Sequence, residues 1–141
     1  MAHILIVDDD AAFRESLGET LHDLGHTVLQ AGTTNAGLHR LRTEPVEVAI
    51  VDLRMPGEDG LVFLRKAADI SPAPCIMLTA YASGGNTIEA MRLGAFDHLT
   101  KPVARAALVR TLERALQSAR AAEPVEDADG MATDTEDFEL V

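Results

Sequence analysis

Short, mostly apolar runs alternate with segments of helical periodicity along this chain of 141 residues. The runs span residues 3–7, 27–29, 48–51, 74–78 and 96–100. Strands that are apolar along their whole length are typical of a parallel sheet that is covered on both faces. Strands that alternate with helices indicate crossover connections between parallel strands. We therefore expect an α/β fold, a doubly wound parallel sheet of five strands with five helices.

The segments between the runs place apolar residues on one helical face. After Asp10, a preferred N-cap residue, four such residues recur before Gly25 ends the pattern: Phe13, Leu17, Leu21 and Leu24. The other four helices are expected over residues 34–41, 60–68, 87–93 and 103–120.

The composition of the chain changes near its C-terminal end. Residues 123–141 carry eight acidic and no basic residues, and therefore −8 of the net charge of −11. We interpret residues 1–122 as one domain and residues 123–141 as an acidic linker or tail. The last four residues turn apolar again, and they could lead into an output domain after Val141.

Charge and hydropathy also exclude some classes of partner. The chain has no basic patch of the kind that contacts nucleic acid. It has no run of the roughly 20 apolar residues that a membrane-spanning helix needs, and no N-terminal signal pattern. We expect a cytoplasmic protein that contacts neither nucleic acid nor membrane directly.

Four of the apolar runs end in residues that suit phosphate chemistry. The first leads into the aspartates at residues 8–10, the third into Asp52, the fourth into Thr79 and the fifth into Lys101. The carboxyl ends of parallel strands meet at one edge of an open α/β sheet, where such proteins bind their ligands. We therefore expect these side chains to line a single pocket.

Asp8, Asp9 and Asp52 would bring three carboxylates together at that edge. Such a group repels itself unless a cation neutralises it. Mg²⁺ prefers oxygen ligands, binds proteins through one or two carboxylates and keeps several waters. The sequence therefore predicts a Mg²⁺ site, with Asp10 capping the following helix instead of joining the group.

Asp52 stands alone at its strand end, before a tight loop at residues 56–60. A single carboxylate beside Mg²⁺ can act as a nucleophile toward a phosphoryl group and form an acyl phosphate. The Lys101 ammonium can pair with a phosphoryl oxygen, or with Asp52 before the phosphoryl arrives. The Thr79 hydroxyl and the Ala80 N–H can donate to the other oxygens.

Together these motifs resemble a response-regulator receiver domain of two-component signalling, from residue 3 to about residue 120. The matching stretches are Asp8-Asp9, the run Asp-Leu-Arg-Met-Pro-Gly-Glu-Asp-Gly that starts at Asp52, Thr79-Ala80, Gly94-Ala95-Phe96-Asp97 and Lys101-Pro102. In detail the chain is most similar to receivers of sigma-54-dependent activators of the nitrogen-regulation type. The resemblance implies a flavodoxin-like sheet with the strand order 2-1-3-4-5.

The resemblance also implies roles for the residues at the strand ends. Asp52 would accept the phosphoryl group from the phosphohistidine of a histidine kinase. Mg²⁺ would be bound by Asp9, Asp52 and the backbone carbonyl of Arg54, with Asp8 acting through water. Such a domain is a phosphoacceptor for signalling and not an enzyme, apart from slow self-dephosphorylation.

A switch follows from the same resemblance. Thr79 and Lys101 would contact the phosphoryl group, and Thr79 would shift toward it while a ring on the fifth strand turns inward. This biases the face formed by the fourth helix, fifth strand and fifth helix, which could pair two copies of the chain. The family usually has Tyr or Phe three residues before the lysine, whereas this chain has His98. The smaller, polar ring either keeps the switch or weakens it.

Two other functions are compatible with parts of the pattern. A haloacid-dehalogenase-type phosphatase would use Asp8 and Asp10, with Thr79 and Lys101 in its later motifs. It would need a further strand ending in an acidic pair, and it leaves Asp52 unexplained. A phosphorylation-independent interaction module would have no use for the full set of polar residues at the strand ends. The receiver interpretation explains all of them, and by the resemblance such a receiver would control transcription.

Overall fold

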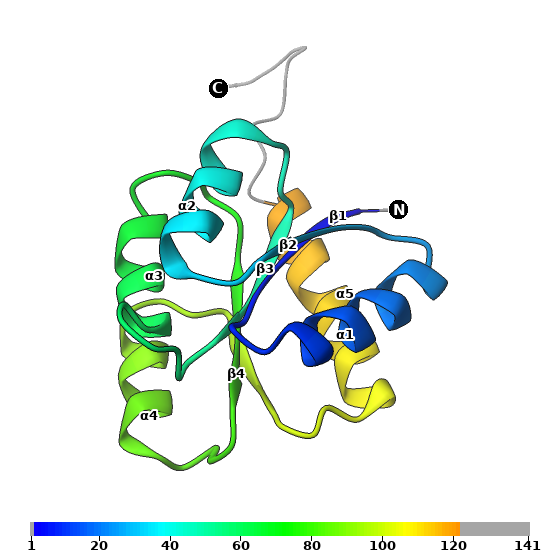
Figure 1. Ribbon diagram of the computed structural model, residues 1–141. Coiled ribbons are helices and arrows are strands. Elements are labelled where there is room, and N and C mark those ends of the chain that lie inside the picture. Colours follow the sequence, from blue (N-terminus) through cyan, green and yellow to red (C-terminus); the bar gives the residue numbers. More distant parts are fainter. Residues whose placement is uncertain (1, 122–141) are drawn as a thin grey trace, which may run out of the picture.

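A computed structural model describes residues 2–121 as a parallel sheet between two layers of helices (Figure 1). The strands are β1 (His3–Val7), β2 (Thr27–Ala31), β3 (Val48–Asp52), β4 (Cys75–Thr79) and β5 (Asp97–Thr100). Their order is β2-β1-β3-β4-β5. The predicted α/β class and the strand order are confirmed. The predicted linker at residues 123–141 lies outside the described residues.

Helices cover both faces of the sheet (Figure 1). They are α1 (Ala11–Asp23), α2 (Thr34–Thr43), α3 (Gly60–Ala67), α4 (Gly85–Arg92) and α5 (Arg105–Ala121). α1 and α5 lie on one face, and α2, α3 and α4 lie on the other. None of the helices in this described part is long and apolar enough to cross a membrane.

The strands are apolar throughout because successive side chains point into different cores. Ile4 and Ile6 of β1 belong to the core under α1 and α5, whereas Leu5 and Val7 belong to the core under α2 and α3. All four side chains are fully buried. Each such burial stabilises the fold by about 1.5–3 kcal/mol relative to exposure in water.

The helix ends differ slightly from the sequence expectation. α4 begins at Gly85, two residues before the predicted start, and its first buried residue is Thr87. The periodic pattern marks the buried face of a helix, so it does not detect a first turn that is exposed. α1 starts as expected, because the Asp10 side chain accepts a hydrogen bond from the Phe13 N–H.

The register of the sheet aligns the carboxyl ends of its strands. Val7 at the end of β1 pairs with Ala31 and with Val51. On the other side, Asp52 of β3 pairs with Leu78, and Thr79 pairs with Thr100. The residues that follow these positions therefore emerge at one edge of the sheet.

Candidate functional site

Three carboxylates meet at this edge, as the sequence predicts. Asp52 is the last residue of β3, and Asp8 and Asp9 directly follow β1. One oxygen of each carboxylate lies within 4.8 Å of an oxygen of the others. Asp8 is fully buried, Asp52 is 7% exposed and Asp9 is exposed. The group therefore has one solvent-facing side, from which a ligand can enter.

Lys101 reaches this group from the loop after β5. Its Nζ lies 2.8 Å from Asp8 Oδ2 and 3.5 Å from Asp52 Oδ2. The sequence suggested the pair with Asp52, and the structure adds a closer pair with the buried Asp8. Burial alone would lower the pKa of Lys101, but the two carboxylates outweigh it and hold the pKa above its ordinary value. Lys101 is therefore charged at neutral pH.

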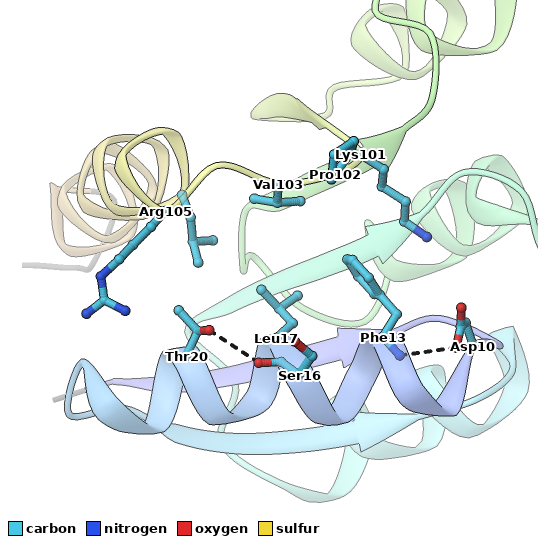
Figure 2. A pocket seen from close by; sticks show the side chains of 10 residues that line it. Asp10, Phe13, Ser16, Leu17, Thr20, Lys101, Pro102, Val103 and Arg105 are labelled. Carbon is cyan, nitrogen blue, oxygen red and sulfur yellow. Dashed lines mark hydrogen bonds between the residues drawn. The ribbon is translucent and has the colours of Figure 1, made fainter.

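The Lys101 ammonium also lies over an aromatic ring. Its Nζ is 4.3 Å from the centroid of the Phe13 ring of α1, and Figure 2 shows the two side chains facing each other. They stand at one end of a groove of about 620 Å³ between α1 and the start of α5, lined also by Leu17, Pro102 and Leu108. The helical periodicity of the sequence places Phe13 on the inner face of α1 but indicates no role for it at the site.

The surroundings of Asp52 disfavour the charged form of its carboxyl group. Burial raises its pKa above the ordinary value, and the neighbouring Asp8 raises it further. The Arg54 N–H, which donates to Asp52 Oδ1 at 3.2 Å, and Lys101 lower the pKa without cancelling that rise. The carboxylates of Asp8, Asp9 and Asp52 thus share the Lys101 ammonium, and a further cation would relieve the repulsion among them.

The loop after β3 packs directly on the strand end. A Cβ atom at Gly60 would lie 2.5 Å from the Asp52 carbonyl oxygen and 2.8 Å from Leu53 Cα. Only glycine fits there. Asp59 then caps α3 by accepting hydrogen bonds from the N–H groups of Leu61 and Val62. The predicted tight loop is confirmed, and it holds the Arg54 backbone beside Asp52.

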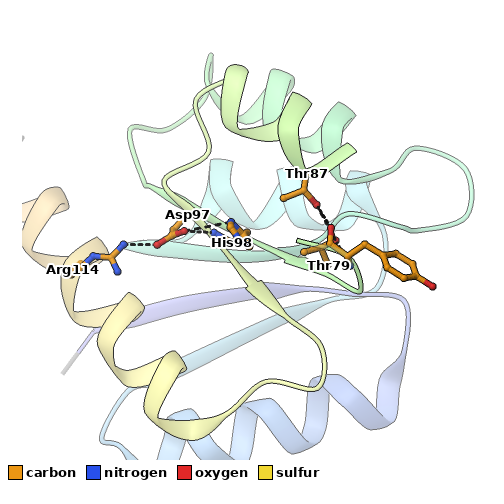
Figure 3. Close-up of polar contacts among 6 residues, drawn as sticks. Thr79, Thr87, Asp97, His98 and Arg114 are labelled. Atoms are coloured by element: carbon orange, nitrogen blue, oxygen red, sulfur yellow. Dashed lines mark hydrogen bonds and ion pairs between the residues drawn. The ribbon is translucent and has the colours of Figure 1, made fainter. Parts of the chain in front are cut away.

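Thr79 ends β4 at the same edge, but its hydroxyl is bonded on the side of α4. Thr79 Oγ1 accepts the Tyr81 N–H at 3.0 Å, and it lies 3.1 Å from the Tyr81 carbonyl oxygen and 3.0 Å from Thr87 Oγ1. Figure 3 shows Thr79 and Thr87 turned toward each other. Ala80, the predicted N–H donor, is exposed beside it. Thr87 has no signal in the sequence that would single it out.

His98 lies on β5 beside α4, in a shallow hollow that it forms with Ile88 and Met91. Its Nδ1 is buried, lacks a hydrogen-bond partner among the described residues and lies 3.6 Å from Asp97 Oδ1. Asp97 accepts the His98 N–H at 2.7 Å and pairs with Arg114 of α5 (Figure 3). The ring that departs from the family pattern is thus held next to a link between β5 and α5.

Three further features lie near the strands and their ends. The Lys101-Pro102 peptide bond is cis. Cys75 is buried, and burial raises the pKa of its thiol to about 12, so it is inert as a nucleophile. Asp10, the second carboxylate of the phosphatase alternative, is used as the N-cap of α1 and lies outside the acidic group.

Comparison with known proteins points to one family. The model of the response regulator receiver domain matches residues 4–113. The transcriptional regulatory protein GlrR of Escherichia coli (strain K12) is 38% identical over 117 residues, which are 82% of this chain and 26% of that protein. The transcriptional regulatory protein FixJ of Bradyrhizobium diazoefficiens is 36% identical over 133 residues, which are 94% of this chain and 63% of FixJ.

Solved structures agree with the sequence matches. A response regulator receiver domain protein from Clostridium thermocellum has a TM-score of 0.82 and 30% identity, covering 87% of this chain and all of that one (100%). NtrX from Brucella abortus has a TM-score of 0.80 and 28% identity, covering 85% of this chain and 28% of that one. The chain thus spans about a quarter of the length of relatives such as GlrR (26%).

These matches confirm the resemblance to receivers of sigma-54-dependent activators. Receivers of this family are phosphoacceptors, and they bind Mg²⁺ at an acidic aspartate cluster. The fold and the carboxylate group at the strand ends agree with that class. The chain belongs to the response regulator receiver domain family, whose members receive signals in two-component systems, and it is related to regulators of transcription.

Proposed function

We propose that this chain accepts a phosphoryl group on Asp52 from the phosphohistidine of a histidine kinase. The observation that carries the proposal is the position of the Asp52 carboxylate at the end of β3, beside the buried Asp8 and 3.5 Å from the Lys101 ammonium. An acidic group that contains the Lys101 ammonium can accept an anionic phosphoryl group only when further positive charge is present. A bound metal ion would supply this positive charge.

The donor set fits Mg²⁺. Oxygens of Asp8, Asp9 and Asp52 converge within 4.8 Å, and the loop that carries Arg54 is held against Asp52. These are hard oxygen ligands of the kind that Mg²⁺ prefers. Asp9, Asp52 and the Arg54 carbonyl would hold the ion, with Asp8 acting through water, and the bound ion would neutralise charge on the phosphoryl oxygens.

Each group of the site has a separate role in the proposed phosphoryl transfer. An Asp52 carboxylate oxygen attacks phosphorus, an oxygen–phosphorus bond forms, and the phosphorus–nitrogen bond to the kinase imidazole breaks. Because burial and Asp8 raise the Asp52 pKa, this carboxylate is more basic than an exposed one. Lys101 would pair with a phosphoryl oxygen, and the Ala80 N–H and Thr79 hydroxyl would donate to others.

The relatives suggest how the signal travels further. The chain spans 26% of GlrR and 63% of FixJ, both transcriptional regulatory proteins. We therefore propose residues 1–122 as the receiver and residues 123–141 as a linker to an output domain. The α4-β5-α5 face, with His98 at its centre, would pair two copies or meet the output domain. A cytoplasmic location fits a regulator of transcription.

The test is phosphorylation of the purified chain by acetyl phosphate with Mg²⁺, followed by intact-mass measurement. We expect one added phosphoryl group, labile to hydroxylamine as an acyl phosphate is. Asp52→Asn should abolish the addition, whereas Asp69→Asn, an exposed carboxylate after α3, should leave it unchanged. Continuous turnover of a phosphate ester that survives in Asp52→Asn would overturn the proposal and support the phosphatase alternative.

A further inference from the structure

The hydroxyl of Thr79 is fully engaged in this state of the protein. A threonine hydroxyl has one proton to donate and can accept two hydrogen bonds. Thr79 Oγ1 accepts the Tyr81 N–H, faces the Tyr81 carbonyl oxygen at 3.1 Å and faces Thr87 Oγ1 at 3.0 Å. To donate to a phosphoryl oxygen, Thr79 must give up this arrangement.

Thr87 is the partner that comes from another element. It lies in the first turns of α4, is only 2% exposed, and its Oγ1 is 3.0 Å from Thr79 Oγ1 and 2.9 Å from the Tyr81 carbonyl oxygen. Both hydroxyls can reach that one carbonyl. When the Thr79 proton goes to the Tyr81 carbonyl, the Thr87 proton is free for Thr79 Oγ1, and every group of the cluster is satisfied.

We propose that Thr87 is a positioning residue that holds the Thr79 hydroxyl on the α4 side while Asp52 is unphosphorylated. The inference rests on the proposed function in one respect, the role of Thr79 at the phosphoryl group. When Thr79 turns to a phosphoryl oxygen, the Thr87 hydroxyl keeps a partner in the Tyr81 carbonyl. The buried Thr87 hydroxyl therefore has a hydrogen-bond partner in both arrangements, so its contact with Thr79 can open without leaving this hydroxyl unsatisfied.

A consequence is a direct path from the site to α4. When the Thr79 hydroxyl turns to the phosphoryl group, its hydrogen bond to Thr87 breaks. The start of α4 and the preceding loop are the first segments to lose a contact. Ile88, the neighbour of Thr87, is 52% exposed and Met91 is 40% exposed. Movement at Thr87 would therefore reach the outer surface of α4 within one turn.

The first test measures the Thr79 side chain in the unphosphorylated protein. Three-bond methyl couplings in NMR report the χ1 rotamer of a threonine. We expect a single Thr79 rotamer in the wild type and in Thr87→Ser. In Thr87→Val, which removes the hydroxyl at similar volume, we expect couplings that are averaged over several Thr79 rotamers. Thr111→Val, at a buried threonine of α5, is the matched control and should leave Thr79 unchanged.

The second test measures binding of beryllium fluoride, a phosphoryl mimic, in the presence of Mg²⁺. Thr87→Val should bind it more tightly, by up to about fivefold, because one hydrogen bond that holds Thr79 away is missing. Thr87→Ser and Thr111→Val should bind as the wild type does. Thr87→Ala repeats both measurements without the methyl groups, should valine disturb the packing of α4.

The two proposals fail in different ways. A single Thr79 rotamer in Thr87→Val and Thr87→Ala, or unchanged or weaker binding of beryllium fluoride, would overturn the role of Thr87. The rotamer measurement uses no phosphoryl group, so it stands even where Asp52 is not phosphorylated. Absence of a phosphoryl group on Asp52 in the wild type would overturn the proposed function alone.

Discussion

At the scale of single residues, the site depends on charges that compensate one another incompletely. Lys101 is shared between Asp8 and Asp52, and its ammonium rests against the Phe13 ring. A cation over an aromatic face gains about 0.5–2 kcal/mol, depending on how far water is excluded. Phe13 therefore limits where the flexible lysine side chain can place its charge.

Replacing Phe13 by leucine should loosen Lys101. Leucine keeps an apolar side chain in the groove but has no ring face for the ammonium, so phosphorylation of Asp52 by acetyl phosphate should slow by about two- to fivefold. In NMR, the Lys101 side-chain protons should lose the upfield shift that the ring causes. Phe13→Tyr keeps the ring and should behave as the wild type; equal rates and shifts in all three proteins would contradict the role of Phe13.

At the scale of elements, two contacts decide how the site is attached to the fold. Gly60 lets the start of α3 lie against the end of β3. At the opposite side of the sheet, Asp97 joins β5 to α5 through Arg114, whose guanidinium also lies 5.6 Å from the Phe96 ring centroid. One contact holds β3, which ends in the proposed phosphoacceptor Asp52, and the other holds β5, which carries His98.

Gly60→Ala should destabilise the protein by about 1–3 kcal/mol, because the added methyl group meets backbone atoms that cannot move independently. The variant should also phosphorylate poorly, since the Asp52 backbone must shift. Gly85→Ala is the control, because a Cβ atom there meets nothing within 4 Å. Urea unfolding measures the stability of Gly60→Ala and of Gly85→Ala, and equal unfolding midpoints of the two variants would refute the steric argument.

Arg114→Gln should lower stability in a pH-dependent way. Burial alone would raise the Asp97 pKa, but the hydrogen bond from Arg114 and the His98 N–H hold the pKa below its ordinary value of 3.8. A carboxyl whose pKa is depressed on folding stabilises the protein above the unfolded pKa, and this contribution is lost as the pH falls through the folded pKa.

We therefore expect Arg114→Gln to cost about 0.5–1 kcal/mol at pH 7, since Arg114 is largely exposed. The difference from the wild type should shrink below about pH 4. Arg110→Gln changes an exposed arginine of the same helix and serves as the control. Thermal unfolding across the pH range measures the effect; a difference that grows in acid would argue against the Asp97 pair.

At the scale of the whole molecule, the sheet gathers acidic side chains that are distant in sequence at one edge. Asp8 and Asp52 are both buried, and burial together with Asp8 raises the Asp52 pKa. The fold therefore stores electrostatic repulsion at the edge where the proposed ligand binds. A cation that binds only the folded chain relieves that repulsion and shifts the unfolding equilibrium.

Mg²⁺ should reverse the order of thermal stability of the wild type and the Asp52→Asn variant. Without divalent cations, Asp52→Asn should unfold a few degrees above the wild type, because about 1 kcal/mol moves the midpoint of such a domain by roughly 4 °C. With Mg²⁺ at about 100 times its Kd, the wild type should gain about 2.7 kcal/mol and overtake the variant.

The control for this experiment is Asp69→Asn, which should follow the wild type in both conditions. Calorimetry of each protein, once with a chelator and once with Mg²⁺, gives two unfolding midpoints for each protein. An equal response of wild type and Asp52→Asn to Mg²⁺ would show that the ion binds elsewhere.

The sequence by itself was sufficient for the sheet and for the members of the acidic group. Strand character and the identity of the residue after each strand are local, and parallel topology brings strand ends to one edge whatever the side chains are. Asp8, Asp9, Asp52 and Lys101 could therefore be assigned to one pocket from their positions along the chain.

Only the tertiary structure decided how these groups are paired. The Lys101 contact with Asp8 joins residues 93 positions apart, and the Thr79 contact with Thr87 depends on where α4 docks. Such contacts follow from side-chain rotamers and from the packing of helices against the sheet, which no periodicity of the sequence encodes. The residues at the strand ends indicate the proposed phosphoryl transfer. The packing of α1 and α4 determines how the Lys101 and Thr79 side chains are oriented before that transfer.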